Sequence, residues 1–330
     1  MTTDSVEPYL NGVREGNRRM LAKTITLVES SLPAHQELAA AILDGLLPYT
    51  GQAIRLGISG VPGVGKSTFI ETFGMMLIRK GLSVAVLAVD PSSSRSGGSI
   101  MADKTRMDKL ALEEKAFIRP SPTEGTLGGV ARRTREVMHI CEAAGYDVVI
   151  VETVGVGQSE TRVASMVDFF LVLMLAGAGD ELQGIKKGIL ELADAIVINK
   201  ADGNNIEKAR LAKKAYENAL SLLTPSSPSW SPPVLTCSAL ELTGIDAVWD
   251  TVLDHREKLT ATGEFDQKRR NQAFDWMWML VEEGLKARFF SNKEVQAQLP
   301  KIKQAVAAGA VTPAAAANDL LALLEKKGMR

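Results

Sequence analysis

The segment IRLGISGVPGVGKSTFIETF, residues 54–73, contains the most informative pattern in this chain. It begins as a short apolar strand, passes through a loop rich in glycine, and continues into a helical pattern. Residues 60–67 match the pattern G-x-x-x-x-G-K-[ST] in the strand–loop–helix context that this pattern requires. The N–H groups of such a loop surround phosphate oxygens, and the helix N-terminus adds a favourable dipole. The residues expected to hold a nucleotide here are Gly60, Pro62, Gly63, Val64, Gly65, Lys66, Ser67 and Thr68.

Two side chains of this loop have roles set by their chemistry. Lys66 is expected to reach the β- and γ-phosphates and is a candidate catalytic residue. The hydroxyl of Ser67 is expected to bind Mg²⁺. A glycine loop with a purely structural role is the alternative, and the strand–loop–helix context disfavours it.

Further along the chain, short apolar strands alternate with longer helical stretches. This alternation is typical of βαβ units, so we predict an α/β fold with a mostly parallel central sheet flanked by helices. The expected strands are AIRLGIS (53–59), SVAVLAVD (83–90), AFIRPS (116–121), DVVIVET (147–153), FFLVLML (169–175), AIVINK (195–200) and VLTCSA (234–239).

Both ends of the chain have helical spacing instead. We expect a helical N-terminal extension (1–50), a nucleotide-binding domain (51–262) and a helical C-terminal arm (263–330). The last helix of the arm should begin with Thr312 as N-cap and Pro313 in the first turn. An apolar stripe on the arm predicts a homodimer interface, with packing on its own domain as the alternative. The stripe consists of Phe274, Trp278, Val281, Leu285 and Phe289.

The segment NKAD (199–202) follows a predicted strand directly. The carboxylate of Asp202 can accept both guanine N1–H and the 2-amino hydrogens, which adenine does not present in that arrangement. Asn199 would bond the base and hold neighbouring loops, and the stem of Lys200 would lie along the base. Four residues are a weak motif alone, and an ordinary Asn-Lys turn is the alternative, but their place after a phosphate-binding loop favours GTP over ATP. In CSAL (237–240), the backbone amides of Ser238, Ala239 and Leu240 are expected at the guanine carbonyl.

The strand VVIVE ends in the carboxylate of Glu152, and Gly155 follows three residues later. In P-loop GTPases an acid at this place lies near Mg²⁺, and the glycine amide reaches the γ-phosphate. Both residues are therefore catalytic candidates, although a solvated acid is the ordinary finding at a strand end. The usual acid is aspartate, so Glu152 is expected to reach Mg²⁺ through a water.

Two further acids are candidate metal ligands. Asp90 closes a predicted strand, and Asp103 lies beyond the Ser/Gly-rich stretch that follows. For Asp103 the alternative is a carboxylate at the start of a helix.

The composition of the whole chain excludes several classes of protein. Its 38 basic and 39 acidic residues balance, so we expect neither nucleic acid nor an anionic membrane surface as a partner. The apolar run 169–178 is too short to cross a bilayer, and the N-terminus lacks a signal core. Cys141 and Cys237 are too few for a disulfide framework. A cytoplasmic protein is the simplest interpretation.

Together these segments resemble the MeaB/ArgK family of GTPases. The resemblance covers most of the chain and rests on AKTITLVES (22–30), GVPGVGKST (60–68), AVDPSSSRSGGSI (88–100), TLGGVARRTRE (126–136), VETVGVGQSE (151–160), GAGDELQGIKKGI (177–189) and NKAD (199–202). It implies a GTPase, with GTP or GDP and Mg²⁺ bound, that gates adenosylcobalamin loading of methylmalonyl-CoA mutase and protects that enzyme from inactivation.

The resemblance also bears on the cofactor and on the partner contact. No cobalamin is expected on this chain, because none of its three histidines lies in a D-x-H-x-x-G motif. Residues 177–188 leave the carboxyl end of a strand, where switches gather, and are expected to transmit the nucleotide state to the mutase. The partner-contacting candidates in this segment are Asp180, Gln183, Lys186 and Lys187.

Two other functions remain open at this stage. A kinase that passes the γ-phosphate to a protein would need an acceptor site, and no feature of the sequence marks one. A metallochaperone GTPase would be expected to carry a histidine-rich tract or a C-x-x-C pair, and the sequence contains neither.

Overall fold

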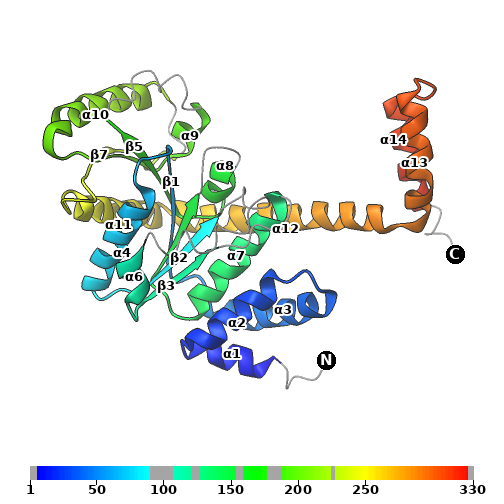
Figure 1. The fold of residues 1–330 in the computed structure, drawn as a ribbon, viewed down its shortest axis with the longest axis horizontal. Coiled ribbons are helices and arrows are strands. Elements are labelled where there is room, and N and C mark those ends of the chain that lie inside the picture. The colour runs from blue at the N-terminus through cyan, green and yellow to red at the C-terminus, as the bar shows by residue number, and fades with distance from the viewer. Residues whose placement is uncertain are drawn as a thin grey trace. The chain divides into compact units, whose positions relative to one another are not determined.

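A sheet of parallel strands forms the core of the α/β part of this chain, which is described here from a computed structural model (Figure 1). The structure describes residues 6–89, 107–120, 127–153, 159–176, 187–223 and 227–325. Within these ranges a seven-stranded sheet has the order β3-β2-β4-β1-β5-β6-β7, and every neighbouring pair is parallel. The strands are β1 (Ile54–Gly60), β2 (Val84–Val89), β3 (Ala116–Pro120), β4 (Val148–Thr153), β5 (Phe169–Leu175), β6 (Ala195–Asn199) and β7 (Val234–Thr236). The predicted α/β fold with a parallel sheet is confirmed.

Helices cover both faces of the sheet. Successive residues of β4 point to opposite faces: Val149 and Val151 join one apolar cluster, and Val148 and Ile150 join the other. This explains why the predicted strands are apolar throughout instead of alternating. The second cluster is closed by α4 (Lys66–Arg79), α6 (Asp108–Leu112) and α11 (Ile245–Thr262). The first is closed by α7 (Leu127–Ala143), α8 (Ser159–Ala164), α9 (Lys187–Leu192), α10 (Ile206–Ser221) and the N-terminal helices.

The N-terminal part is helical, as predicted. It consists of α1 (Glu7–Arg14), α2 (Arg18–Glu29), α3 (Pro33–Leu46) and a short 3₁₀ turn (Leu47–Tyr49). Asn17 caps α2 by accepting hydrogen bonds from the N–H groups of Arg19 and Met20, both at 3.1 Å. These helices pack against α7, so they extend the layer on that face of the sheet.

The C-terminal part is helical too. It consists of α12 (Glu264–Ser291), α13 (Lys293–Ala307) and α14 (Pro313–Glu325). The N–H of Ala315 donates to Oγ1 of Thr312 at 3.2 Å, which confirms the predicted cap of the last helix. The chain forms two compact units, residues 1–272 and 273–330, and the division falls inside α12.

The first turns of α12 are held by charged groups inside the first unit. Arg269 forms a bidentate pair with Asp168, with N–O distances of 2.8 and 2.7 Å, and also donates to the carbonyl of Ala53 at 2.8 Å. Gln272 donates to the carbonyl of Val167 at 2.8 Å. Paired charges of this kind tolerate burial because each partner offsets the desolvation of the other.

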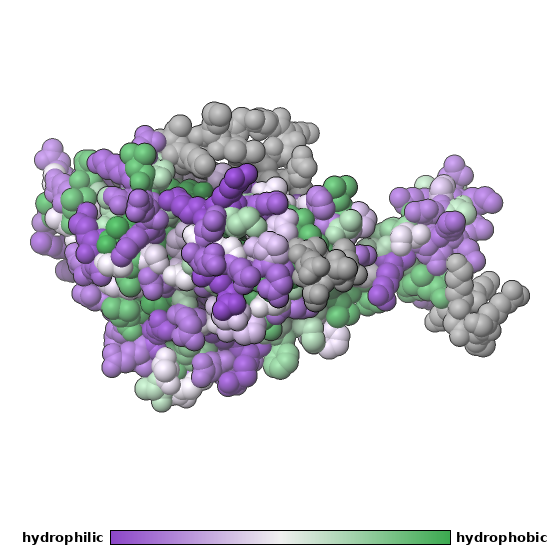
Figure 2. Space-filling view, turned by 90° about the horizontal axis from the view of Figure 1, so that it is seen from below, coloured by the Kyte–Doolittle hydropathy of each residue, from purple (hydrophilic) through white to green (hydrophobic). Residues whose placement is uncertain are grey.

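The surface of the first unit is mixed. On the face shown in Figure 2, hydrophilic residues predominate and hydrophobic residues lie between them in small groups. Among the residues that the structure describes, no helix has the length and apolar content needed to span a bilayer.

Candidate nucleotide-binding site

The loop between β1 and α4 has a backbone that requires glycine. Gly63 and Gly65 have φ angles of +75° and +87°, in the left-handed region that disfavours other residues. At Gly60, an added Cβ would lie 2.5 Å from the carbonyl oxygen of Leu173 on the neighbouring strand β5. The Nζ of Lys66, the first residue of α4, donates to the carbonyl of Gly60 at 2.8 Å. The loop therefore curls back over the start of the helix.

Asn199, at the end of β6, connects this loop to the loop after β7. Its side chain is only 1% exposed, and its Nδ2 donates to the carbonyl of Val64 at 2.9 Å. Its Oδ1 accepts from the N–H of Ala239 at 3.3 Å. Lys200 adds a second connection, because its Nζ donates to the carbonyl of Gly63 at 2.8 Å. Three segments far apart in the sequence are thus held at the carboxyl edge of one sheet, where α/β folds place their ligands.

Asp202 is held by a residue of the loop after β7. The hydroxyl of Ser238, which is fully buried, donates to Oδ2 of Asp202. Backbone bonds between Ser238 and Thr243, at 3.0 and 3.1 Å, close the loop 238–243. The carboxylate of Asp202 therefore has one oxygen held by the protein, which restricts the direction in which it can meet a ligand.

Two buried carboxylates lie near the ammonium group of Lys66. Glu152 on β4 is 4% exposed and Glu160 on α8 is 1% exposed. Burial lowers the pKa of Lys66 below its usual value, and the charges of Glu152 and Glu160 act in the opposite direction. The two carboxylates therefore oppose the effect of burial on the pKa of this ammonium group.

The position of Glu152 follows from the strand register. It pairs with Ile58 of β1, so its side chain points to the same face as Ile58, which is the face that α4 covers. The next residue, Thr153, points to the other face and donates its hydroxyl to Ser59 at 2.9 Å. Glu152 thus stands beside the helix that begins with Lys66.

The structure brings together most of the predicted nucleotide-binding residues. The glycine loop, Lys66, the segment 199–202 and the loop 238–240 all lie at the carboxyl ends of β1, β6 and β7. Several predicted residues fall outside the described residues, namely Asp90, Asp103, Gly155, Asp180, Gln183 and Lys186. For Lys187 the structure describes the backbone at the start of α9.

Sequence reasoning missed two contributors to this site. The first is Glu160, whose place at the start of a helix suggests a solvent-exposed side chain, but which is buried. The second is Thr72, whose hydroxyl donates to the carbonyl of Ala239 at 3.0 Å and so ties α4 to the loop after β7. No local pattern in the sequence marks either residue.

A phosphate-binding loop joined through an asparagine to an NKAD strand end defines this chain as a P-loop GTPase. The comparisons with known proteins then give the family: residues 21–294 match the family model described as methylmalonyl-CoA mutase-associated GTPase MeaB, and the chain belongs to this family. The resemblance to the MeaB/ArgK family that the sequence indicated is therefore confirmed. The enzyme is a hydrolase acting on GTP.

Relatives and a solved structure agree with this assignment. The GTPase ArgK of Escherichia coli is 56% identical over 86% of this chain and 85% of its own length. A probable GTPase of Mycobacterium tuberculosis is 55% identical over 96% of this chain and 95% of its own. The mitochondrial methylmalonic aciduria type A homolog of Mus musculus is 46% identical over 96% of this chain and 79% of its own. A crystal structure described as a LAO/AO transport system kinase matches with a TM-score of 0.79 and 44% identity, covering 98% of this chain and 99% of that one.

Proposed function

We propose that this GTPase is a chaperone of methylmalonyl-CoA mutase that gates the loading of adenosylcobalamin and protects the mutase from inactivation. The family description and the name of the mouse relative support the link to this enzyme. The observation that carries the nucleotide side of the proposal is the pair of bonds from Asn199, which joins the phosphate loop to the base-binding loop. Adenosylcobalamin itself is proposed to reside on the mutase.

The phosphate end of the site suits a nucleotide with Mg²⁺. Ser67 and Glu152 offer a hydroxyl and a carboxylate, the hard oxygen ligands that Mg²⁺ prefers, and phosphates and waters commonly complete its shell. Among the described residues there is no group of three or more His, Cys, Asp or Glu side chains that could hold a metal ion. When bound, Mg²⁺ would neutralise charge on the β- and γ-phosphates. Asp90 and Asp103 are proposed as further ligands, directly or through water.

The chain's own residues then carry the hydrolysis. Lys66 would leave the carbonyl of Gly60 and place its ammonium on the β- and γ-phosphates, where negative charge develops. The N–H of Gly155 would bond the γ-phosphate, and Glu152 would support the metal shell. Because there is little covalent chemistry for the protein to perform, positioning these charges supplies most of the rate.

At the base end, we propose that Asp202 selects guanine. Ser238 holds one carboxylate oxygen, so the group is oriented before the nucleotide arrives. The N–H groups of Ser238, Ala239 and Leu240 are proposed to contact the guanine carbonyl, and the stem of Lys200 to lie along the base. Preorganised bonds of this kind raise affinity because less freedom is lost on binding.

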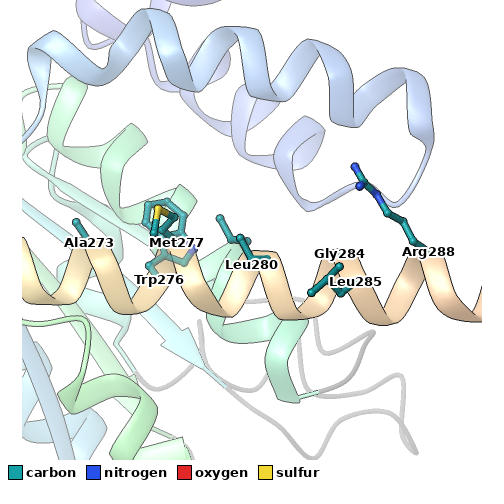
Figure 3. Close-up of a pocket in the computed structure, with 8 residues that line it drawn as sticks. Ala273, Trp276, Met277, Leu280, Gly284, Leu285 and Arg288 are labelled. Atoms are coloured by element: carbon teal, nitrogen blue, oxygen red, sulfur yellow. The ribbon is translucent and has the colours of Figure 1, made fainter. Parts of the chain in front are cut away.

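The second unit supports a proposed homodimer. Its part of α12 is apolar on more than one side: Phe274, Trp278 and Leu285 are each 60% exposed. A surface hollow of about 470 Å³ lies along the same stretch, and Trp276, Met277 and Leu280 project from one side of the helix into it (Figure 3). Monomeric proteins rarely expose large apolar groups in such number. A second copy of the arm is the proposed cover.

The contact with the mutase is proposed for residues 177–188. They lead from β5, whose carboxyl end lies on the nucleotide side of the sheet, into α9. Asp180, Gln183, Lys186 and Lys187 would pair with the mutase in one nucleotide state and not in the other. Coupling between two binding sites is reciprocal in free energy, so a mutase that prefers one state must change nucleotide affinity in return.

Co-purification tests the proposed partner. The purified chain should retain methylmalonyl-CoA mutase to different extents with GDP and with a non-hydrolysable GTP analogue, and Lys66→Ala should remove the difference. Alanine at both Lys186 and Lys187 should leave basal GTP turnover nearly intact and abolish its acceleration by the mutase. Absence of retention in every nucleotide state would refute the partner. Transfer of labelled γ-phosphate to protein, instead of release as free phosphate, would favour the kinase alternative.

A further inference from the structure

Thr72 makes a contact that its place inside a helix does not predict. It belongs to α4 and lies about 9 Å along the helix axis from Lys66, the first residue of that helix. A threonine hydroxyl in a helix commonly donates to the carbonyl four residues earlier, as Thr251 of α11 donates to Ala247 at 2.7 Å. The hydroxyl of Thr72 donates instead to the carbonyl of Ala239 at 3.0 Å. Because a hydroxyl has one hydrogen to donate, this distant bond replaces the local one.

This bond fixes the peptide that joins Ala239 to Leu240. A peptide is planar and trans, so its carbonyl and its N–H point in opposite directions. The hydroxyl of Thr72 holds the carbonyl of this peptide toward α4, and the N–H of Leu240 must therefore point away from α4. A rotation of the peptide that turned this N–H elsewhere would break the bond to Thr72.

The neighbouring N–H groups of the loop already have acceptors. The N–H of Ser238 donates to the carbonyl of Thr243 at 3.0 Å, and the N–H of Ala239 donates to Oδ1 of Asn199 at 3.3 Å. The N–H of Leu240 has no acceptor among the residues that the structure describes, and the side chain of Leu240 is 79% exposed. Of the three N–H groups proposed to meet the guanine carbonyl, that of Leu240 is thus the one available to a ligand.

The available N–H is linked to the carboxylate proposed to select guanine. The hydroxyl of Ser238 donates to Oδ2 of Asp202, and its oxygen accepts from the N–H of Glu241 at 3.0 Å. One side chain therefore relates the carboxylate to the turn that contains Leu240. In guanine the ring N1–H, which the carboxylate would accept, is directly beside the ring carbonyl. A donor held close to a carboxylate matches this pair of groups.

We propose that Thr72 is a positioning residue for the guanine base: by binding the carbonyl of Ala239, it directs the N–H of Leu240 toward the guanine carbonyl. The inference rests on the proposed nucleotide site and names a residue that orients its base end. The helix that carries Thr72 also begins at the phosphate loop, so one rigid element relates the phosphate end of the site to the base end. The direction of the N–H is set before the nucleotide binds, which lowers the cost of binding.

The test combines one variant with one altered nucleotide. Thr72→Val keeps the shape of the side chain and removes the hydroxyl. In 6-thio-GDP, sulfur replaces the oxygen of the guanine carbonyl and accepts hydrogen bonds weakly, while N1–H and the 2-amino group remain. Dissociation constants for GDP and 6-thio-GDP are measured with the full-length protein by displacement of a fluorescent GDP analogue. The wild type should bind GDP more tightly than 6-thio-GDP.

Thr72→Val should weaken GDP about fivefold, the effect of losing one neutral hydrogen bond, and should weaken 6-thio-GDP less. The preference for GDP over 6-thio-GDP should therefore shrink. A threonine that only stabilised α4 would weaken both nucleotides by the same factor when it is replaced, and the preference would stay as it is in the wild type.

Two further variants serve as controls. Thr72→Ser restores the hydroxyl and should restore the wild-type preference. Thr251→Val removes a hydroxyl that bonds within its own helix and should change neither dissociation constant. An equal loss for both nucleotides in Thr72→Val, or no loss, overturns this inference alone. So does a wild type that binds GDP and 6-thio-GDP equally well, a result that requires no variant. A wild type that does not bind GDP overturns the proposed site as well.

Discussion

Replacing Asn199 with alanine removes the side chain that joins the phosphate loop to the loop after β7. The change removes the hydrogen bonds to the carbonyl of Val64 and from the N–H of Ala239, at 2.9 and 3.3 Å. Each neutral hydrogen bond contributes about 1 kcal/mol net, so the free energy of unfolding should fall by about 2 kcal/mol. The weaker contact from the Sγ of Cys237, at 3.4 Å, adds little to this sum.

The same two hydrogen bonds should also contribute to the affinity for GDP. They hold the phosphate loop and the base loop at one separation, and without them the nucleotide must impose that separation itself. If the whole 2 kcal/mol is taken from binding, the dissociation constant for GDP rises about 30-fold through the loss of these two bonds, and loss of the predicted bond from Asn199 to the base would add to this. Titration with a fluorescent GDP analogue measures this change, and urea unfolding of the same sample measures the loss of stability.

A matched control is available in Asn17, which also makes two hydrogen bonds and caps α2. Asn17→Ala should cost about 1 kcal/mol in the free energy of unfolding and leave GDP affinity unchanged. The reasoning fails if Asn199→Ala binds GDP as the wild type does, or if the control loses as much affinity.

Three other outcomes can be measured. Asp202→Asn should weaken GTP tenfold or more and favour xanthosine triphosphate, since a charge-assisted bond contributes about 1.5–3 kcal/mol; a variant that still prefers GTP would remove this residue from base selection. Trp278→Glu, in the exposed apolar stretch of α12, should convert the proposed dimer to a monomer in sedimentation, whereas Leu112→Glu, at an 86% exposed site in the first unit, should not. Burial, aided by the charge of Arg55, lowers the pKa of His139 to about 4, below the ordinary value of about 6.5 that it has when unfolded. The unfolded chain therefore binds the extra proton, and stability should fall by about 1.4 kcal/mol per pH unit from pH 6.5 down to 4, a dependence that His139→Gln should remove from urea midpoints.

Local patterns along the chain were enough to predict the architecture and the class of ligand. Each of the seven strands could be predicted because a strand covered on both faces is a short apolar run, and helices separate these runs at βαβ spacing. The glycine loop could be predicted because its backbone conformation requires glycine at fixed positions, here Gly63 and Gly65. The cap at Thr312 followed from the same kind of local rule. In all these cases the determining interactions lie within a few residues along the chain.

Tertiary structure alone decided which distant groups meet. Thr72 donates to the carbonyl of a residue 167 positions away, and Asn199 reaches the phosphate loop across 135 positions. Glu160 has the sequence context of an exposed acid at a helix start, and only the packing of α8 against the sheet buries it. Such pairs follow from strand order and helix packing, which many sequences share with different side chains, so no local pattern marks them. Burial then changes their chemistry, because charges are screened less by the protein interior than by water.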